Sequence, residues 1–281
     1  MQLSRRNFLR FSLTAFAVGP LLGQTAKPPA TPPTSQPAAS NRYGFRSSEH
    51  IKVDISEKFI TVHSDGIPDH TTGDFPNRNN PNRITKQNYT FTIPLKPVKA
   101  DKITQLPMGP IGVAINGVPF YNPYNAEGAD AAKNEVFDDC CGHSDPMGRY
   151  HYHIYPKCIH TSFFDKPGEH SPLIGYAFDG YAIYGPLSDN GKAPADLDAC
   201  NGHTDATRGY HYHVTNKFPY ILGGYRGVVE QSNFDHGPRD AQGRPMGGPD
   251  GQRGPGGPGR GPPPRGGRGP RRGGPPPGPP T

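Results

Sequence analysis

The feature that most constrains the fold of this 281-residue chain is an internal duplication. Residues 111–123 and 174–186 share the pattern I-G-x-A-x-[ND]-G followed by six residues ending in proline, 63 positions apart. Residues 142–153 and 202–213 share the pattern G-H-[ST]-D-x4-Y-H-Y-H, 60 positions apart. A repeat of this length predicts two structurally equivalent halves.

Each half begins with a predicted β-hairpin. Asn116-Gly117 and Asp179-Gly180 separate two apolar runs, and both dipeptides are typical of two-residue type I′ turns. Further strands are expected at Ile51–Ile55, Phe59–His63, Tyr89–Leu95 and Phe218–Tyr225, a long loop at 68–81 and a short helix within 126–136. The sequence therefore predicts a mainly β fold, internally duplicated and β-sandwich-like or made of two packed sheets, with short helices in loops.

Composition predicts the domain organisation. Residues 237–281 hold 16 of the 37 Gly and 14 of the 36 Pro, and residues 25–40 form a second, Pro-rich segment. Such segments cannot bury enough apolar surface to fold, so we expect a Pro-rich linker at 25–40 and a disordered Gly/Pro/Arg-rich tail at 237–281. Residues 41–236 have ordinary composition and predict one β domain with tandem halves at about 111–153 and 174–213.

The first 24 residues resemble a twin-arginine signal peptide. Ser4-Arg5-Arg6 and Phe8-Leu9 precede the apolar run 11–22. That run is too short to cross a membrane as a mature helix, so we expect no mature transmembrane segment. The resemblance implies export by the Tat pathway to a periplasmic or secreted location. This route carries folded proteins, often with a cofactor already bound.

The net charge of +6 comes from the arginines of the two ends, which leaves residues 25–236 mildly acidic. Proteins that bind nucleic acid usually show a basic footprint, so we expect no nucleic-acid partner. The Arg-rich tail is either a flexible spacer or an attachment to an anionic cell-envelope surface.

The duplicated histidines predict a metal site. Alternate residues of a strand point to the same face, so the two histidines of each Y-H-Y-H lie side by side and the upstream histidine can fold back to join them. Neutral imidazoles suit copper or zinc. The candidate ligands are His143, His151, His153 and Asp145 in the first half, and His203, His211, His213 and Asp205 in the second.

Several points stay open at this stage. The two aspartates are either metal ligands or hydrogen-bond acceptors that fix the histidine tautomer. Each half holds its own ion, or the halves share one centre. A hydrogen-bonded His/Tyr/Asp network without metal is the competing interpretation. The six other histidines show no spacing pattern and are interpreted as incidental, with His63 and His70 as weak candidates.

The paired Y-H-Y-H, the preceding D-x-C-x-G-H-x-D and the I-G-x-A-x-[ND]-G hairpin resemble the YHYH-domain family of exported proteins. The resemblance covers roughly residues 90–230. It implies a domain boundary, but no reaction and no catalytic residue.

Four cysteines in an exported chain favour disulfides. We expect Cys140 to pair with Cys200 across the halves and Cys141 with Cys158 around the first Y-H-Y-H. The competing interpretation is a Cu(I) ligand beside His143.

Three functions fit these patterns. The preferred one is an exported protein that binds copper or zinc and handles or stores the metal. The alternatives are a metalloenzyme with a three-histidine site and a structural or ligand-binding β module. No nucleophile elbow, phosphate loop or paired-carboxylate signature is found, so the sequence leaves open whether the protein is an enzyme.

Overall fold

The computed structural model describes residues 42–159 and 168–235. The predicted signal peptide, the linker and the tail lie outside these ranges, as do His160 and His236. Within the described residues no helix has the length and apolar character needed to cross a membrane.

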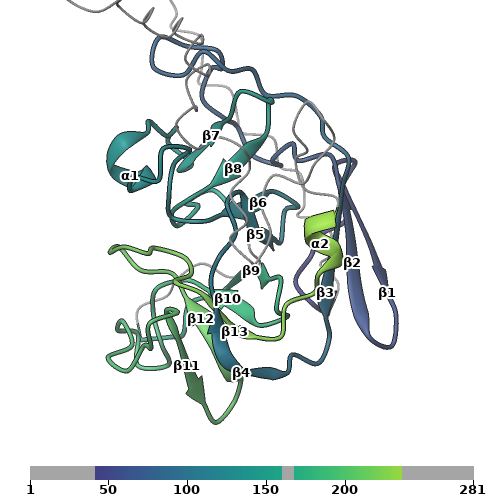
Figure 1. Cartoon of the computed structure of the whole chain (residues 1–281), viewed down its shortest axis with the longest axis vertical. Helices are drawn as coiled ribbons and strands as arrows, with labels where there is room; N and C mark the ends of the chain where they lie inside the picture. Colours follow the sequence, from purple (N-terminus) through teal and green to yellow (C-terminus); the bar gives the residue numbers. More distant parts are fainter. Residues whose placement is uncertain (1–41, 160–167, 236–281) are drawn as a thin grey trace, which may run out of the picture. The chain divides into compact units, whose positions relative to one another are not determined.

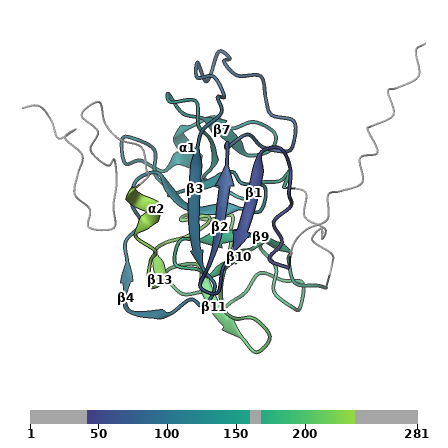
Figure 2. The ribbon, with the colours of Figure 1, turned by 90° about the vertical axis from the view of Figure 1, so that its right-hand side faces the viewer.

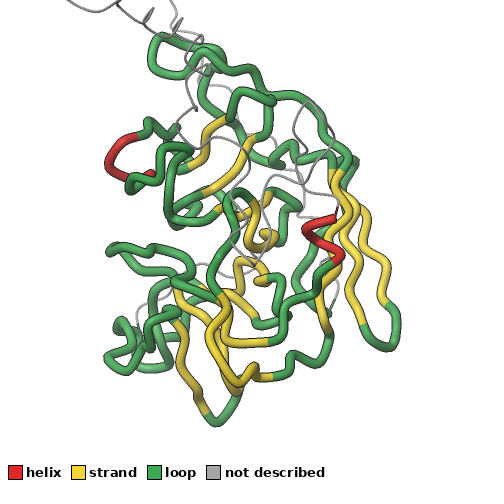
Figure 3. The backbone as a smooth tube through the Cα atoms, viewed as in Figure 1, coloured by secondary structure: helices red, strands yellow, loops and turns green. Residues whose placement is uncertain are grey.

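The described residues form a mainly β structure with two short helices (Figure 3). A three-stranded antiparallel sheet contains β1 (Ile51–Ile55), β2 (Phe59–Ser64) and β3 (Tyr89–Pro94), which confirms three of the expected strands. Residues of β2 alternate between buried and half-buried, as expected for a sheet with one face on the core. Figure 2 shows this sheet as a layer in front of β9 and β10.

The larger sheet has eight strands in the order β11-β12-β10-β9-β5-β6-β8-β7. Their bounds are β5 Pro110–Ala114, β6 Pro119–Tyr121, β7 Gly142–Ser144, β8 Tyr150–Tyr152, β9 Leu173–Ala177, β10 Ala182–Tyr184, β11 Gly202–Asp205 and β12 Gly209–His213. Under the sequence duplication, β5 to β8 correspond to β9 to β12, so the order reads the same from both edges. The two halves are therefore related by a local two-fold at the β5–β9 pair, and their histidine strands lie at opposite ends of the sheet (Figure 1).

Two glycines make this central pairing possible. Gly112 pairs with Ala177 and Ala114 with Gly175, and these two pairs are equivalent under the duplication. A Cβ atom would lie 2.5 Å from a carbonyl oxygen of the opposite strand at Gly112, and 2.3 Å at Gly175. The repeated I-G-x-A pattern is thus explained by close backbone approach at the junction of the halves.

The predicted type I′ turns are wrong in detail. Ala114 and Ala177 each accept a hydrogen bond from the glycine three residues on, and each donates to the carbonyl four residues on. Only the glycines, Gly117 and Gly180, have positive φ. Each turn is therefore a three-residue loop ending in a left-handed glycine, because neither Asn116 nor Asp179 adopts the positive φ that a type I′ turn requires.

One other expectation needs correction. The predicted strand at Phe218–Tyr225 is replaced by turns, and β13 (Tyr225–Gly227) begins only at its last residue, pairing with β4 (Lys99–Thr104). The short helix expected within 126–136 is confirmed as α1 (Ala131–Asn134). A second short helix, α2 (Ser232–Asp235), lies near β3.

The core lies between the three-stranded sheet and the eight-stranded sheet. Phe91 of β3 stacks on Phe178, with ring centroids 5.5 Å apart, and both rings are buried. Ser64 at the end of β2 donates a 2.8 Å hydrogen bond to the carbonyl of Gly117. The expectation of packed sheets is therefore confirmed. The histidine strands belong to the eight-stranded sheet, which packs on the three-stranded sheet.

Candidate metal centres

Strand pairing brings the first three histidines together. His143 on β7 lies directly opposite His151 on β8, and His153 follows β8 on the same face as His151. The Nε2 atom of His151 is 3.0 Å from that of His143 and 2.9 Å from that of His153. All three rings are buried, so three imidazole nitrogens converge in a small protected space.

The other ring nitrogens are held by backbone. His151 Nδ1 lies 2.9 Å from the carbonyl oxygen of Arg149, and His153 Nδ1 lies 2.6 Å from that of Asn122. His143 is hydrogen-bonded to the backbone of Val136. A carbonyl oxygen only accepts, so Nδ1 of His151 and Nδ1 of His153 carry the proton, and their Nε2 atoms present lone pairs to each other.

Burial keeps these histidines neutral. It lowers the pKa of His143 to about 4 and that of His153 to about 3. The pKa of His151 lies well below its usual value, first because of burial and then because of the two neighbouring histidines. At neutral pH all three imidazoles of this group are therefore uncharged.

A carboxylate that the sequence reading missed completes this group. Oε2 of Glu135 lies 3.5 Å from Nε2 of His143 and 3.5 Å from Nε2 of His153. This oxygen is buried and has no hydrogen-bond partner among the described residues. Burial, and then the charge of Glu127, raise the pKa of Glu135 to about 7. We call His143, His151, His153 and Glu135 the first cluster.

The second half repeats the geometry. His203 on β11 lies opposite His211 on β12, with their Nε2 atoms 3.2 Å apart. Nε2 of His211 is also 3.0 Å from that of His213, and 3.4 Å from that of His170. We call His170, His203, His211 and His213 the second cluster.

Each Nδ1 atom of the second cluster also faces an acceptor. The acceptors are the carbonyl of Ser171 at 2.8 Å for His170, Asp196 Oδ1 at 2.9 Å for His203, the carbonyl of Gly209 at 2.9 Å for His211 and that of Gly185 at 2.6 Å for His213. Burial lowers the pKa of His213 to about 3, and it also lowers the pKa of His170 and of His211. The Nε2 atom of His211 thus has three other Nε2 atoms as neighbours, and those of His170, His211 and His213 all lie within 4.8 Å of one another.

The tyrosines of Y-H-Y-H point to the opposite side and anchor the strands. Tyr150 donates a 2.7 Å hydrogen bond to Asp138, whose other oxygen accepts the backbone N–H of Cys140 and Gly142. In the second half, Tyr210 bonds Asp198 in the same way at 3.0 Å. The aspartate of D-x-C-x-G-H is therefore a structural partner of the first tyrosine.

The second tyrosine of each motif reaches the hairpin turn of its own half. Tyr212 donates a 2.6 Å hydrogen bond to Asp179, and the Tyr152 hydroxyl lies 3.2 Å from the equivalent Asn116. His70 Nε2 is also 2.6 Å from the Tyr152 hydroxyl. In each motif the tyrosines therefore anchor the strand to neighbouring turns, whereas the histidines point into the cluster.

The two candidate aspartates, Asp145 and Asp205, bind turn backbone and arginine and are not part of the histidine clusters. Oδ1 of Asp145 accepts two backbone N–H groups of the β7–β8 turn, and its Oδ2 is bound by Arg149. Asp205 repeats this with Arg208 at 2.6 Å, and its Oδ2 stays 3.9 Å from His211 Nε2. Neither accepts the Nδ1 proton of a histidine in the clusters, because turn backbone and arginine already satisfy these carboxylates.

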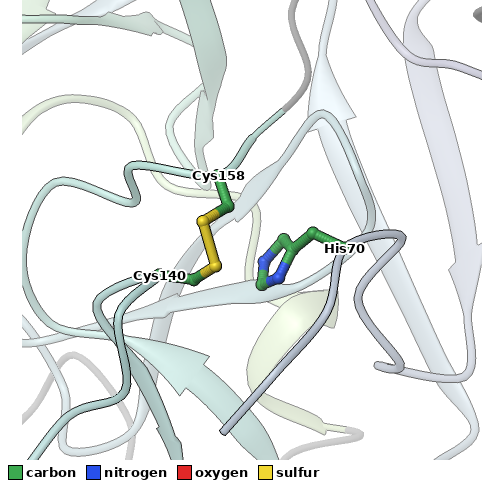
Figure 4. A group of neighbouring side chains, drawn as sticks. All are labelled: His70, Cys140 and Cys158. Carbon is green, nitrogen blue, oxygen red and sulfur yellow. A yellow bond between two sulfur atoms is a disulfide. The ribbon is translucent and has the colours of Figure 1, made fainter. Parts of the chain in front are cut away.

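The predicted disulfide pairing is wrong. Cys140 is bonded to Cys158, whereas Cys141 and Cys200 are buried free thiols. Cys140 and Cys200 precede β7 and β11, which form opposite edges of the sheet, so they cannot meet. Figure 4 shows the imidazole of His70 beside the disulfide. Because both sulfurs are used in that bond, this group offers no thiolate to a metal.

Sequence reading found six of the eight residues in the two clusters. It missed Glu135 and His170, because neither belongs to the repeated motif. His170 precedes β9 by three residues, and under the 63-position shift its equivalent is Pro107. The sequence signal for His170 was its position just before a strand of the repeat.

Comparison with known proteins supports the family assignment. Residues 90–193 match the model of the family described as YHYH protein. No curated protein and no solved structure matches this chain. The match to the YHYH family thus covers the whole first half and the hairpin of the second half.

Proposed function

We propose that this protein binds two transition-metal ions, copper or zinc, one in each histidine cluster. The observation that carries the proposal is that the Nε2 atoms of each cluster converge, while the Nδ1 atoms on the other side of the rings face backbone or carboxylate acceptors. Neighbouring Nε2 lone pairs at 2.9–3.4 Å repel one another unless a cation lies between them. Two nitrogens bound tetrahedrally to one ion at about 2.1 Å would be about 3.4 Å apart, so these nitrogens need to separate by only a few tenths of an ångström to hold an ion.

Two features argue against a purely structural histidine network. Within each cluster the Nε2 atoms lie close to one another, and the tyrosines of the same strands point to the opposite face, where Tyr150, Tyr210 and Tyr212 bond aspartates rather than these histidines. The carbonyl acceptors on Nδ1 are also the outer partners typical of metal-bound histidine, where they fix the tautomer and raise ligand basicity.

We further propose that the protein acts outside the cytoplasm, where it handles or stores the metal. The signal-like N-terminus motivates this location, and the Cys140–Cys158 disulfide supports it, because such bonds persist in oxidising compartments. A metalloenzyme is the second candidate, and it is favoured by a cavity that reaches the first cluster.

The test is elemental analysis of the full chain purified from the compartment in which it accumulates. We expect two copper or zinc ions per chain. The double variant His151→Ala/His153→Ala should lose one ion, and the equivalent His211→Ala/His213→Ala should lose the other. The control His63→Ala, at a half-exposed ring on β2, should lose none. A folded wild-type chain that holds no metal after incubation with copper or zinc would overturn the proposal.

A further inference from the structure

The two clusters differ in their surroundings, because the first cluster borders a cavity. A cavity of about 530 Å³ is lined by His143, His151, His153 and Glu135 of the first cluster. This volume lies in the range of sites that hold small organic molecules. The first cluster therefore adjoins a space much larger than one water molecule.

The same side of the second cluster is filled by His170. The 63-position shift makes Pro107 the equivalent of His170, and hydrogen bonds show that the two halves correspond as far as Gly109 and Pro172, two residues away. The N–H of Asn122 bonds the carbonyl of Gly109 at 3.1 Å, and the N–H of Gly185 bonds that of Pro172 at 3.1 Å. Proline has no donor atom for a metal, and the two residues after it, Met108 and Gly109, line the cavity.

The charges of the two clusters differ as well. With a divalent ion, three neutral imidazoles and the carboxylate of Glu135 leave one positive charge at the first cluster. An anionic ligand would neutralise that charge. At the second cluster the imidazoles of His170, His211 and His213 would hold the ion, and no carboxylate belongs to that group. Asp196 there bonds the outer nitrogen of the neighbouring His203.

Several exposed apolar side chains belong to the lining of the cavity. Met108, Tyr124, Val136 and Met147 line it, and their exposed fractions are 45%, 43%, 52% and 52%. They are four of the nine large hydrophobic side chains exposed within the described residues. Apolar side chains gathered around a pocket are typical of a binding surface for an apolar group.

We propose that the ion in the first cluster keeps a coordination position open to the cavity and binds there the carboxylate of a small organic acid with an apolar body. The ion in the second cluster, closed by His170, takes no such ligand. This inference rests on the proposed metal binding and assigns different roles to the two halves, with ligand binding in the first and structural support in the second.

The test uses the full chain loaded with Co²⁺, whose visible absorption reports its coordination. Cobalt is counted by elemental analysis, and benzoate, acetate and azide are titrated as probes. We expect two cobalt ions but only one benzoate per chain, with benzoate bound at least ten-fold more tightly than acetate. His213→Ala, which disables the second cluster, should keep benzoate binding, and His153→Ala, which disables the first, should lose it.

Two further variants keep the test decisive if a histidine variant fails to fold. Met108→Ala/Met147→Ala changes only exposed side chains, and it should reduce the preference for benzoate over acetate while azide affinity is unchanged. His170→Ala should open the second cluster and allow a second azide to bind. Equal benzoate binding at both clusters, or at neither when two cobalt ions are present, would overturn the inference. Absence of cobalt from both clusters would instead refute the proposed function.

Discussion

The glycine before the first histidine of each motif allows a sharp prediction about stability. A Cβ atom at Gly142 would lie 2.3 Å from both Cζ and the hydroxyl oxygen of Tyr150. That ring is 1% exposed, and its hydroxyl is bonded to Asp138, so it has no free space into which to move. Gly142→Ala must therefore displace a buried tyrosine.

The magnitude follows from two contributions. Overpacking of a well-packed core costs about 1–3 kcal/mol. Loss of the hydrogen bond to the Asp138 carboxylate adds about 1.5–3 kcal/mol. We expect Gly142→Ala to lower the free energy of unfolding by about 2.5–6 kcal/mol, a large part of the roughly 5–15 kcal/mol of a typical domain.

The equivalent Gly202 supplies a matched comparison. A Cβ there would lie 2.1 Å from the hydroxyl of Tyr210, but this ring is only half-buried and can rotate toward solvent. We expect Gly202→Ala to cost about 1–2 kcal/mol, at the low end of overpacking effects.

The assay is urea unfolding of both variants with a chelator present, so that metal binding does not contribute to stability. In a Tyr150→Ala background the cost of Gly142→Ala should fall below about 1 kcal/mol, because the clashing ring is gone. The reasoning is refuted if Gly142→Ala unfolds at the wild-type urea midpoint, or if Gly202→Ala is the more damaging change.

Three other outcomes follow from the same contacts. Cys158→Ser should lower the free energy of unfolding by about 3 kcal/mol, since the bond to Cys140 spans 18 residues, and a reducing agent should then have no further effect in thermal unfolding. Tyr212→Phe should cost about 1–3 kcal/mol in urea unfolding, because it removes a donor from the buried Asp179 carboxylate; wild-type stability would contradict this role. In metal-free protein the depressed pKa values of His143 and His153 mean that the unfolded state binds more protons below pH 6.5. Stability should therefore fall as the pH drops from 6.5 toward about 4, and a urea midpoint that is constant between pH 7 and 4 would be the opposite result.

The local sequence pattern was sufficient to predict those elements that depend only on neighbouring residues. β-Branched alternation located β1, β2 and β3, and the duplicated Y-H-Y-H placed His151 and His153 on one face. Strand geometry alone requires that alternate residues share a face, so this part of the site needed no tertiary information.

Long-range pairing decided the rest. Whether the halves share one ion or hold separate clusters depends on the β5–β9 pairing, which sends β7 and β11 to opposite edges of the sheet. The same pairing excluded a bond between Cys140 and Cys200. No local signal encodes this order, because several strand arrangements satisfy the same hydrophobic pattern.

The sequence by itself determined that this protein has two equivalent β halves, each with three histidines able to converge. Only the tertiary structure brought Glu135 to one cluster and His170 to the other. Both come from segments outside the repeat, and such segments are positioned by the packing of neighbouring strands rather than by their own sequence. For this reason the repeat predicts that the two sites are similar, but it does not predict how they differ.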